Sequence, residues 1–262
     1  MLWATEALVV EIFPGKLYSF DKPIPLDGRV TWVPETAFGF QPAHCYVLLT
    51  GSVPLIVDPG LAFAEDEVIT GLQGLISEGA PVEVFLTRSH ADSTGNLGAI
   101  IGSFRVTTIY TTPVLDPRAE LAPVADGPDL ASPSHSRLEV IDTPLRLLGT
   151  HWGYDHETKT LFTSDSFTHT VTSRADECTI IDSPERDIVT RAEVKDHLYA
   201  TFPWLPEAVT QPIAASLRKI ISSHDVHTIA PARGCVLQGA AVVRRHSDMV
   251  VDVLNSGRAK PL

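Results

Sequence analysis

The sequence contains few cysteines, and their spacing limits what they can do. The three cysteines, Cys45, Cys178 and Cys235, lie far apart among 262 residues and form no Cys-x-x-Cys pair. A disulfide framework or a structural zinc site is therefore not expected. We expect each cysteine to be a buried, unreactive thiol, because free cysteine is among the most buried residue types.

Long apolar runs are also absent. No stretch reaches the roughly 18 consecutive apolar residues that a membrane-spanning helix needs. The first residues of the chain have no basic segment ahead of an apolar one, which a secretory signal would have. We therefore expect no membrane partner, and a cytoplasmic location is the default expectation.

Basic residues are in short supply. The chain has 20 Lys and Arg against 32 Asp and Glu, which gives a formal net charge of −12 at pH 7. A surface with this surplus repels nucleic acid, so no nucleic-acid partner is expected. Any anion-binding function would need a local cluster of basic side chains that acts against the overall charge.

The order of elements predicted from the sequence favours an α/β fold in one domain. Short β-rich segments, among them Leu8–Phe13, Arg29–Val33 and Cys45–Thr50, precede a βαβ pattern, further strands and a final group of helices. Two sheets with helices on their outer faces satisfy this order. The proline-rich stretch Thr112–Arg137 is expected to be a long loop. The helices are predicted over Glu65–Glu78, Asn96–Ile101, Arg191–Thr201, Glu207–Ser222 and Ala240–Leu254.

Polar residues alternate at the end of one predicted strand. The apolar segment Val82–Leu86 runs into a loop that carries Arg88, His90 and Asp92, followed by Gly95. Because a strand has a period of two, these three side chains leave its end on a common side. Polar groups presented at the end of a buried strand commonly form a site.

These residues resemble a motif of the metallo-β-lactamase superfamily. That superfamily has a strand ending in Asp-x-Gly and then a strand ending in Thr-His-x-His-x-Asp-His-x-Gly-Asn. The corresponding segments here are Asp58-Pro-Gly60 and Thr87-Arg-Ser-His-Ala-Asp-Ser-Thr-Gly-Asn96, and the spacing matches without gaps.

Three later segments resemble the flavodiiron and oxygen-binding diiron branch of that superfamily. They are Thr143-Pro-Leu-Arg146, Leu161-Phe-Thr-Ser-Asp-Ser-Phe167 and Ile229-Ala-Pro-Ala-Arg-Gly234. The resemblance covers nearly the whole chain and implies a four-layer αββα sandwich in a single domain over residues 1–262. The flavodoxin-like domain of full flavodiiron proteins is absent from the sequence, so no flavin is implied.

The resemblance also shows where the metal ligands of the family would stand. Three positions that are histidine in the family are arginine here, and a fourth is serine. Arginine stays protonated and offers only donors, whereas zinc needs three or four ligands and non-haem iron at least a facial triad. A dinuclear metal centre is therefore not expected, and no cofactor is predicted. The seven positions are Arg88, His90, Asp92, Ser93, Arg146, Asp165 and Arg233.

The three arginines can replace the metals electrostatically. Asp92 and Asp165 would be uncompensated buried charges if the metals alone were removed, which is strongly unfavourable. Arg88, Arg146 and Arg233 supply three positive charges against these two negative ones, and each guanidinium forms a planar fork suited to carboxylate or phosphate oxygens. The hypothesis is that they bind a small anionic molecule. An equally weighted alternative is a salt-bridge cluster that only holds the retired metal site together.

Four of these residues are candidates for catalysis without a metal: His90, Asp92, Ser93 and Asp165. His90, Asp92 and Ser93 are the residue types of a nucleophilic triad, but close spacing in sequence is a weak signal because triads depend on geometry. Ser93 is interpreted first as a passive replacement for histidine. His90 as a general base, with arginines stabilising a developing anion, is the stronger option, so a metal-independent, hydrolase-like activity stays open.

Two further hypotheses differ in class. In the first, the protein is a mononuclear-metal hydrolase or oxygen-reactive enzyme that uses His90, Asp92, Asp165 and an unmatched histidine, for which His169 is the best candidate. In the second, it is a non-catalytic sensing or interaction protein and the fold is only a scaffold. A homodimer is left open, because related proteins often associate.

Overall fold

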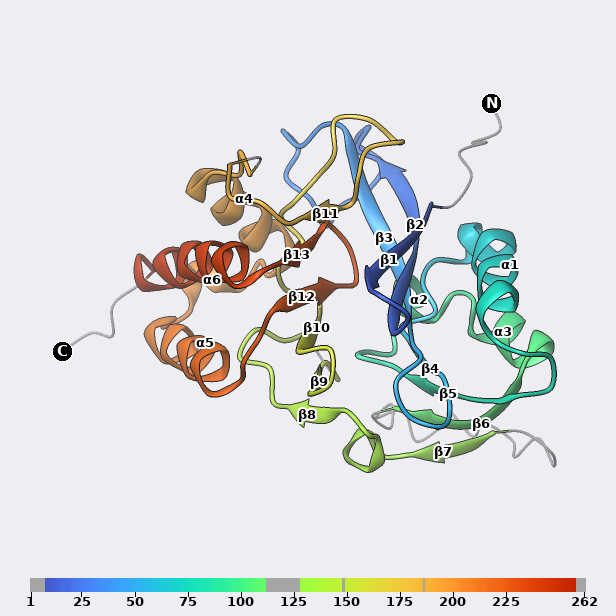
Figure 1. Ribbon diagram of the computed structural model, residues 1–262. Helices are drawn as coiled ribbons and strands as arrows, with labels where there is room; N and C mark the ends of the chain where they lie inside the picture. Colours follow the sequence, from blue (N-terminus) through green and yellow to red (C-terminus); the bar gives the residue numbers. More distant parts are fainter. Residues whose placement is uncertain (1–7, 112–127, 148, 186, 258–262) are drawn as a thin grey trace, which may run out of the picture. The chain divides into compact units, whose positions relative to one another are not determined.

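The structure, a computed structural model, describes residues 8–111, 128–147, 149–185 and 187–257. Within these residues the strands form two sheets, and helices accompany both of them (Figure 1). One sheet has seven strands in the order β1-β2-β3-β4-β5-β6-β7, and the other has six in the order β11-β13-β12-β10-β9-β8. This mixed α/β architecture confirms the fold class expected from the sequence.

The strands are short and most begin or end at proline, glycine or polar residues. They span β1 (Leu8–Phe13), β2 (Leu17–Pro25), β3 (Phe40–Leu48), β4 (Leu55–Val57), β5 (Pro81–Phe85), β6 (Arg105–Tyr110), β7 (Asp129–Ala131), β8 (Glu139–Ile141), β9 (Trp152–Asp155), β10 (Thr160–Ser164), β11 (Ile180–Ile181), β12 (Thr228–Pro231) and β13 (Val236–Gln238). The α-helices span α1 (Glu65–Leu75), α2 (Ala91–Thr94), α3 (Leu97–Ser103), α4 (Arg191–Thr201), α5 (Gln211–Ser223) and α6 (Ala240–Asn255).

The chain divides into two compact units, each assembled from separate segments. The first unit contains Met1–Lys22, Ala43–Ile141 and Leu148–Thr158. The second contains Pro23–Pro42, Asp142–Leu147 and Lys159–Leu262. That the whole chain acts as one domain over residues 1–262 stays a prediction.

The first unit has its core between α1 and the parallel strands β4, β5 and β6. Val68 and Leu72 of α1 are four residues apart, so they share a helical face, and both are buried against the sheet residues Ile56 and Val84. Strand β4 is wholly buried, β5 alternates before two buried residues, and β6 is buried at its last two residues. The polar segments after β4 and β5 are therefore left at the ends of buried strands.

The second unit is organised around α6. This helix buries a broad apolar face that includes Val242, Val250 and Leu254, and both α4 and α5 pack against it (Figure 1). Helix α4 begins with a capping box in which Thr190 Oγ1 accepts from Glu193 N and Glu193 Oε2 accepts from Thr190 N. Its bounds, Arg191–Thr201, are those predicted from the sequence.

Some local predictions are wrong. Arg29–Val33 is a loop with no strand pairing, and the backbone bond from Leu26 N to Gly39 O closes that loop. Of the predicted loop Thr112–Arg137, residues 112–127 lie outside the described part, and the remainder contains β7, which pairs with β6. Cys178 is exposed, whereas Cys45 and Cys235 are buried as expected. No helix in the described residues is long and apolar enough to cross a membrane.

Candidate functional site

In the first unit, the Gly95-Asn96 segment packs against the turn that follows β4. Asn96 Nδ2 donates to the carbonyl oxygens of Pro59, at 2.9 Å, and Leu61, at 3.0 Å, and so holds the turn after β4. Gly95 lies against this turn, where a Cβ atom would come within 2.4 Å of Ala62 N. The glycine and asparagine of the motif are therefore required for close packing of backbone on backbone.

A group of residues in the first unit, here called the Arg88 cluster, consists of Asp58, Thr87, Arg88, Asp92 and Ser93. Asp58 is buried and lies at φ +49°, a conformation that non-glycine residues seldom adopt. Its carboxylate accepts from Thr87 N at 2.9 Å and from Thr87 Oγ1 at 2.6 Å. Burial raises the pKa of Asp58 to about 6, although the Thr87 hydrogen bonds and the Arg88 charge act in the opposite direction.

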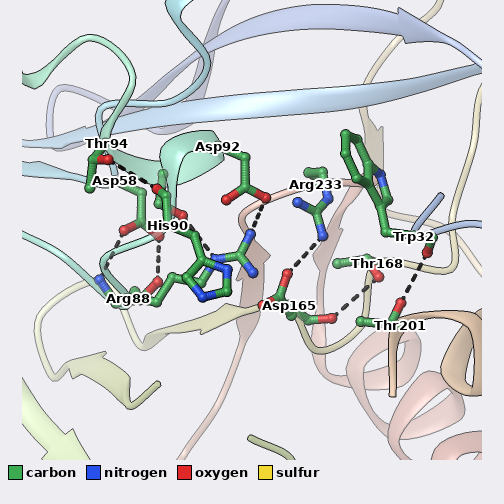
Figure 2. Close-up of polar contacts among 12 residues, drawn as sticks. Trp32, Asp58, Arg88, His90, Asp92, Thr94, Asp165, Thr168, Thr201 and Arg233 are labelled. Atoms are coloured by element: carbon green, nitrogen blue, oxygen red, sulfur yellow. Dashed lines mark hydrogen bonds and ion pairs between the residues drawn. The ribbon is translucent and has the colours of Figure 1, made fainter. Parts of the chain in front are cut away.

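Arg88 is buried and lies at the centre of this cluster (Figure 2). Its Nη2 donates to Asp92 Oδ2, and the two side chains form an ion pair at positions i and i+4. Its Nε donates to Ser93 Oγ at 3.1 Å. The structure therefore brings three of the predicted site residues together, and it places the guanidinium where it neutralises Asp92.

His90 is part of the same loop, but its side chain is exposed. Its carbonyl oxygen begins α2 by accepting from Ser93 N at 2.9 Å and from Thr94 N at 3.0 Å. Within the described residues, the His90 imidazole makes no hydrogen bond. Ser93 Oγ instead accepts from Arg88, and the passive role of Ser93 stays a prediction.

Two predicted site residues of the second unit, Asp165 and Arg233, meet at a strained turn at the end of β10. Ser164 and Phe167 have φ values of +53° and +65°, which are unfavourable for residues with a side chain. Two hydrogen bonds hold the turn, from Ser166 N to Thr163 O at 3.0 Å and from Thr163 Oγ1 to Ser166 O at 2.9 Å. Asp165 lies inside this turn and is buried.

Asp165 belongs to a second group, here called the Arg233 cluster, together with Trp32, Gln41, Thr168 and Arg233. Buried Arg233 donates through Nη2 to Asp165 Oδ1 at 2.7 Å, and its guanidinium carbon lies 4.5 Å from the centroid of the Trp32 ring (Figure 2). Trp32 Nε1 donates to Gln41 Oε1 at 2.9 Å, and Gln41 Nε2 donates to Thr168 O at 2.8 Å. The guanidinium is thus fixed by a carboxylate and by an aromatic face.

Sequence reasoning missed Trp32 and Gln41. They belong to the loop after β2 and to the start of β3, and neither stands in a motif that marks it. Arg146, the third arginine, is exposed and forms no ion pair among the described residues. The structure therefore pairs Arg88 with Asp92 and Arg233 with Asp165, and it leaves Arg146 exposed.

The described residues contain no group of three His, Cys, Asp or Glu side chains placed to hold a metal ion. His169, the histidine expected to complete a mononuclear site, is directed to another partner. Its Nε2 lies 2.8 Å from Nδ1 of His246 on α6. This geometry does not favour the hypothesis of a single bound metal.

Several solved structures resemble the structure of this chain. A putative diflavin flavoprotein A 5 from Nostoc sp. PCC 7120 is 14% identical, with a TM-score of 0.64 and coverage of 95% of this chain and 98% of that chain. The rubredoxin oxygen:oxidoreductase of Desulfovibrio gigas is 14% identical with a TM-score of 0.68, and the match covers 97% of this chain and 63% of that one. The apo state of the chemotaxis sensor ODP from T. denticola is 15% identical with a TM-score of 0.59 and 92% coverage of both chains.

These likenesses establish the fold. The chain has the metallo-β-lactamase-like fold of flavodiiron cores, as its motifs predict. It spans about three fifths of the length of several of the proteins it resembles, 63% of the Desulfovibrio gigas chain for example. No family model matches the sequence, and no curated protein matches it at a significant level.

Proposed function

We propose that this chain is a metal-independent protein of metallo-β-lactamase-like fold that binds a small anionic molecule through Arg88, Arg146 and Arg233. The observation that carries the proposal is that each cluster pairs a buried arginine with an aspartate: Arg88 with half-buried Asp92, and Arg233 with buried Asp165. These pairs neutralise carboxylates that divalent metals would otherwise have to compensate.

A further carboxyl group lies in the Arg88 cluster. Asp58 is a third carboxyl group and lies buried beside Arg88, so the positive surplus expected from three arginines and two aspartates is smaller than the sequence suggests. The cation that an anion can reach is then Arg146, which is exposed and forms no ion pair in the described residues. Arg233, in the same unit as Arg146, adds positive potential, and Arg88 and Arg233 each hold the aspartate that they pair with in place.

Sulfate is a suitable first probe, because its charge is constant across the neutral range. We expect wild-type protein to bind sulfate in isothermal titration at low ionic strength, and Arg146→Ala to weaken that binding about tenfold, the effect of losing one charge-assisted hydrogen bond. Arg218→Ala is the matched control, because Arg218 is an exposed arginine of α5 in the same unit, and it should leave binding unchanged.

Elemental analysis of the same protein completes the test. The proposal expects far less than one metal ion per chain in protein that binds sulfate. Close to two metal ions per chain, or equal sulfate affinity in wild type and Arg146→Ala, would overturn it.

Binding without catalysis is the second candidate, a sensing role. It is favoured by the exposed His90 imidazole and by Ser93 Oγ accepting from Arg88, since no base and nucleophile then face each other. One protein of similar structure is itself described as a chemotaxis sensor. If the fold is only a scaffold for a partner, neutralising the three arginines should change stability and leave partner binding intact. A cytoplasmic location, the lack of a nucleic-acid partner and a homodimer stay predictions.

A further inference from the structure

A chain of buried polar side chains in the second unit lies outside the predicted site. It runs from Asp187 through His246 of α6 to His169, which follows the turn that carries Asp165. His246 Nε2 lies 3.0 Å from Asp187 Oδ2, and His246 Nδ1 lies 2.8 Å from His169 Nε2. All three residues are buried, and Arg245 Nε lies 2.6 Å from the same Asp187 oxygen. Buried polar atoms need partners: His169 Nε2 and His246 Nδ1 share a hydrogen bond, and His246 Nε2 lies at ion-pair distance from Asp187 without the geometry of a hydrogen bond.

The chemistry of the groups fixes the direction of these bonds. An ionised carboxylate only accepts, so the proton on His246 lies at Nε2 and faces Asp187. Nδ1 of His246 is then the acceptor, and His169 donates to it through Nε2. Burial lowers the pKa of both His169 and His246, so both rings are neutral near pH 7. His197 also faces His169, and its pKa is lowered to about 4 by burial.

The backbone around His169 contacts both sides of the Arg233 cluster. On one side, Thr168 O accepts from Gln41 Nε2 at 2.8 Å, and Gln41 holds the Trp32 indole. On the other side, Thr170 Oγ1 accepts from Cys235 N at 2.6 Å, two residues beyond Arg233. His169 lies between these two anchors and is fixed from behind by α6.

The fit at this segment is close. A Cβ atom on Gly234, the residue after Arg233, would lie 2.9 Å from Thr170 Oγ1 and 3.2 Å from Thr168 Cα. A shift of the 168–170 segment would therefore move either the Arg233 backbone or the Gln41–Trp32 pair. The guanidinium and the indole that stacks on it depend on one short segment.

We propose that His169 and His246 are positioning residues for the anion site, and that the Asp187–His246–His169 chain holds the 168–170 segment so that Arg233 and Trp32 keep their stacked geometry. This inference rests on the proposed function only for its binding measurement. Its structural measurement, the environment of the Trp32 indole, is independent of any ligand.

The experiment breaks and restores the central hydrogen bond. His246→Leu removes the acceptor for His169, whereas His246→Asn keeps a neutral acceptor close to the position of Nδ1. His227→Gln is the control, since His227 is an exposed histidine of the same unit that pairs with Asp225. Should His246→Leu not fold, His169→Leu breaks the same bond and His169→Gln restores the donor.

Two readouts are compared at pH 7. The first is the sulfate dissociation constant, which we expect His246→Leu to raise about fivefold, as the loss of one hydrogen bond predicts, while His246→Asn stays within about twofold of wild type. The second is the Trp32 Nε1–H resonance, assigned with Trp32→Phe, which should move in His246→Leu and return in His246→Asn. The control should match wild type in both.

The outcomes separate the two proposals. Wild type that binds no sulfate refutes the proposed function, and the Trp32 resonance alone then decides on the positioning role. An unchanged Trp32 resonance in folded His246→Leu, or equal effects of His246→Leu and His246→Asn, overturns the inference. If His246→Leu weakens sulfate binding and shifts the Trp32 resonance while His246→Asn restores both, the inference is supported. Asparagine would not restore the function of a side chain that only fills space.

Discussion

Asp58 is a buried carboxyl group whose surroundings favour its protonated form. Burial raises its pKa from 3.8 to about 6, so between these values the folded protein holds a proton that the unfolded chain releases. Below about pH 4 this proton contributes about 3 kcal/mol to the free energy of unfolding. That contribution is lost as the pH rises to about 6.

We expect Asp58→Asn to remove this dependence, because an amide does not titrate and its oxygen still accepts from Thr87 N. In urea unfolding between pH 4 and pH 7, wild type should lose stability relative to the variant as the pH rises. Asp66→Asn, at an exposed carboxylate of α1, serves as the matched control. Parallel curves for wild type and Asp58→Asn would contradict a raised pKa.

The residue types of the site could be read from the sequence, but their pairing could not. Arg88 and Asp92 are four residues apart and form an ion pair, but Arg88 lies in the loop before α2, so the helical spacing rule does not predict this pair. The stacking of Arg233 on Trp32 has no sequence signal, because it depends on how distant segments fold together. His90 is the N-cap residue of α2, and the exposure of its side chain likewise has no sequence signal.

At the level of elements, the turn that precedes α3 packs closely on the turn after β4. Gly95 precedes α3 and packs on the turn after β4, where an added Cβ atom would lie 2.4 Å from Ala62 N and 2.8 Å from Gly60 O. Both neighbours are backbone atoms and cannot rotate away. We therefore expect Gly95→Ala to lower the free energy of unfolding by about 1–3 kcal/mol or more, measured by chemical denaturation.

Gly98 provides the matched control for Gly95. It lies inside α3, and an added Cβ atom there would have no neighbour within 4 Å, so alanine meets no obstacle. Because alanine has the higher helix propensity, Gly98→Ala should raise stability by about 0.5–1 kcal/mol. Equal effects of the two substitutions would show that helix propensity, and not the contact between the turns, governs this segment.

The sequence predicts elements best where one face is apolar and the ends are marked. Helix α4 has the predicted bounds because Thr190 and Glu193 form a capping box at its start. Strands β9 and β13 are not predicted: β9 is fully buried and shows no alternation, and β13 has only three residues. The loop at residues 29–33 has β-branched and aromatic residues but no partner strand, which only the folded chain reveals.

At the scale of the whole molecule, segments that pack backbone on backbone stand beside a set of paired charged side chains. The motifs that pack backbone on backbone, such as Gly95-Asn96 on the turn after β4, are kept because the fold needs them. The same chain carries the ion pairs Arg88–Asp92 and Arg233–Asp165. This contrast explains why the fold could be predicted closely from the sequence while the ligand could not.

The acid stability of the molecule depends on groups that act in opposite directions. Burial lowers the pKa of His197 to about 4 and lowers the pKa of His169 and His246 as well. A histidine whose pKa is lower in the folded state binds a proton when the chain unfolds. It therefore lowers the free energy of unfolding as the pH drops below about 6.5, and it has no such effect above that pH. For His197 the full effect is about 3 kcal/mol.

Asp58 opposes this loss, because its raised pKa makes the folded state gain stability as the pH falls from about 6 to 4. The effects of Asp58 and His197, about 3 kcal/mol each, are similar in size and opposite in direction. His169 and His246 therefore decide whether the free energy of unfolding rises or falls as the pH drops. We expect the free energy of unfolding to fall between pH 6.5 and pH 5, as measured by urea titration at each pH. The variant His169→Gln/His246→Asn, which keeps neutral partners on α6 and the 168–170 segment, should show a flatter profile than wild type. A profile that rises towards pH 5 in wild type would instead mean that Asp58 outweighs the histidines.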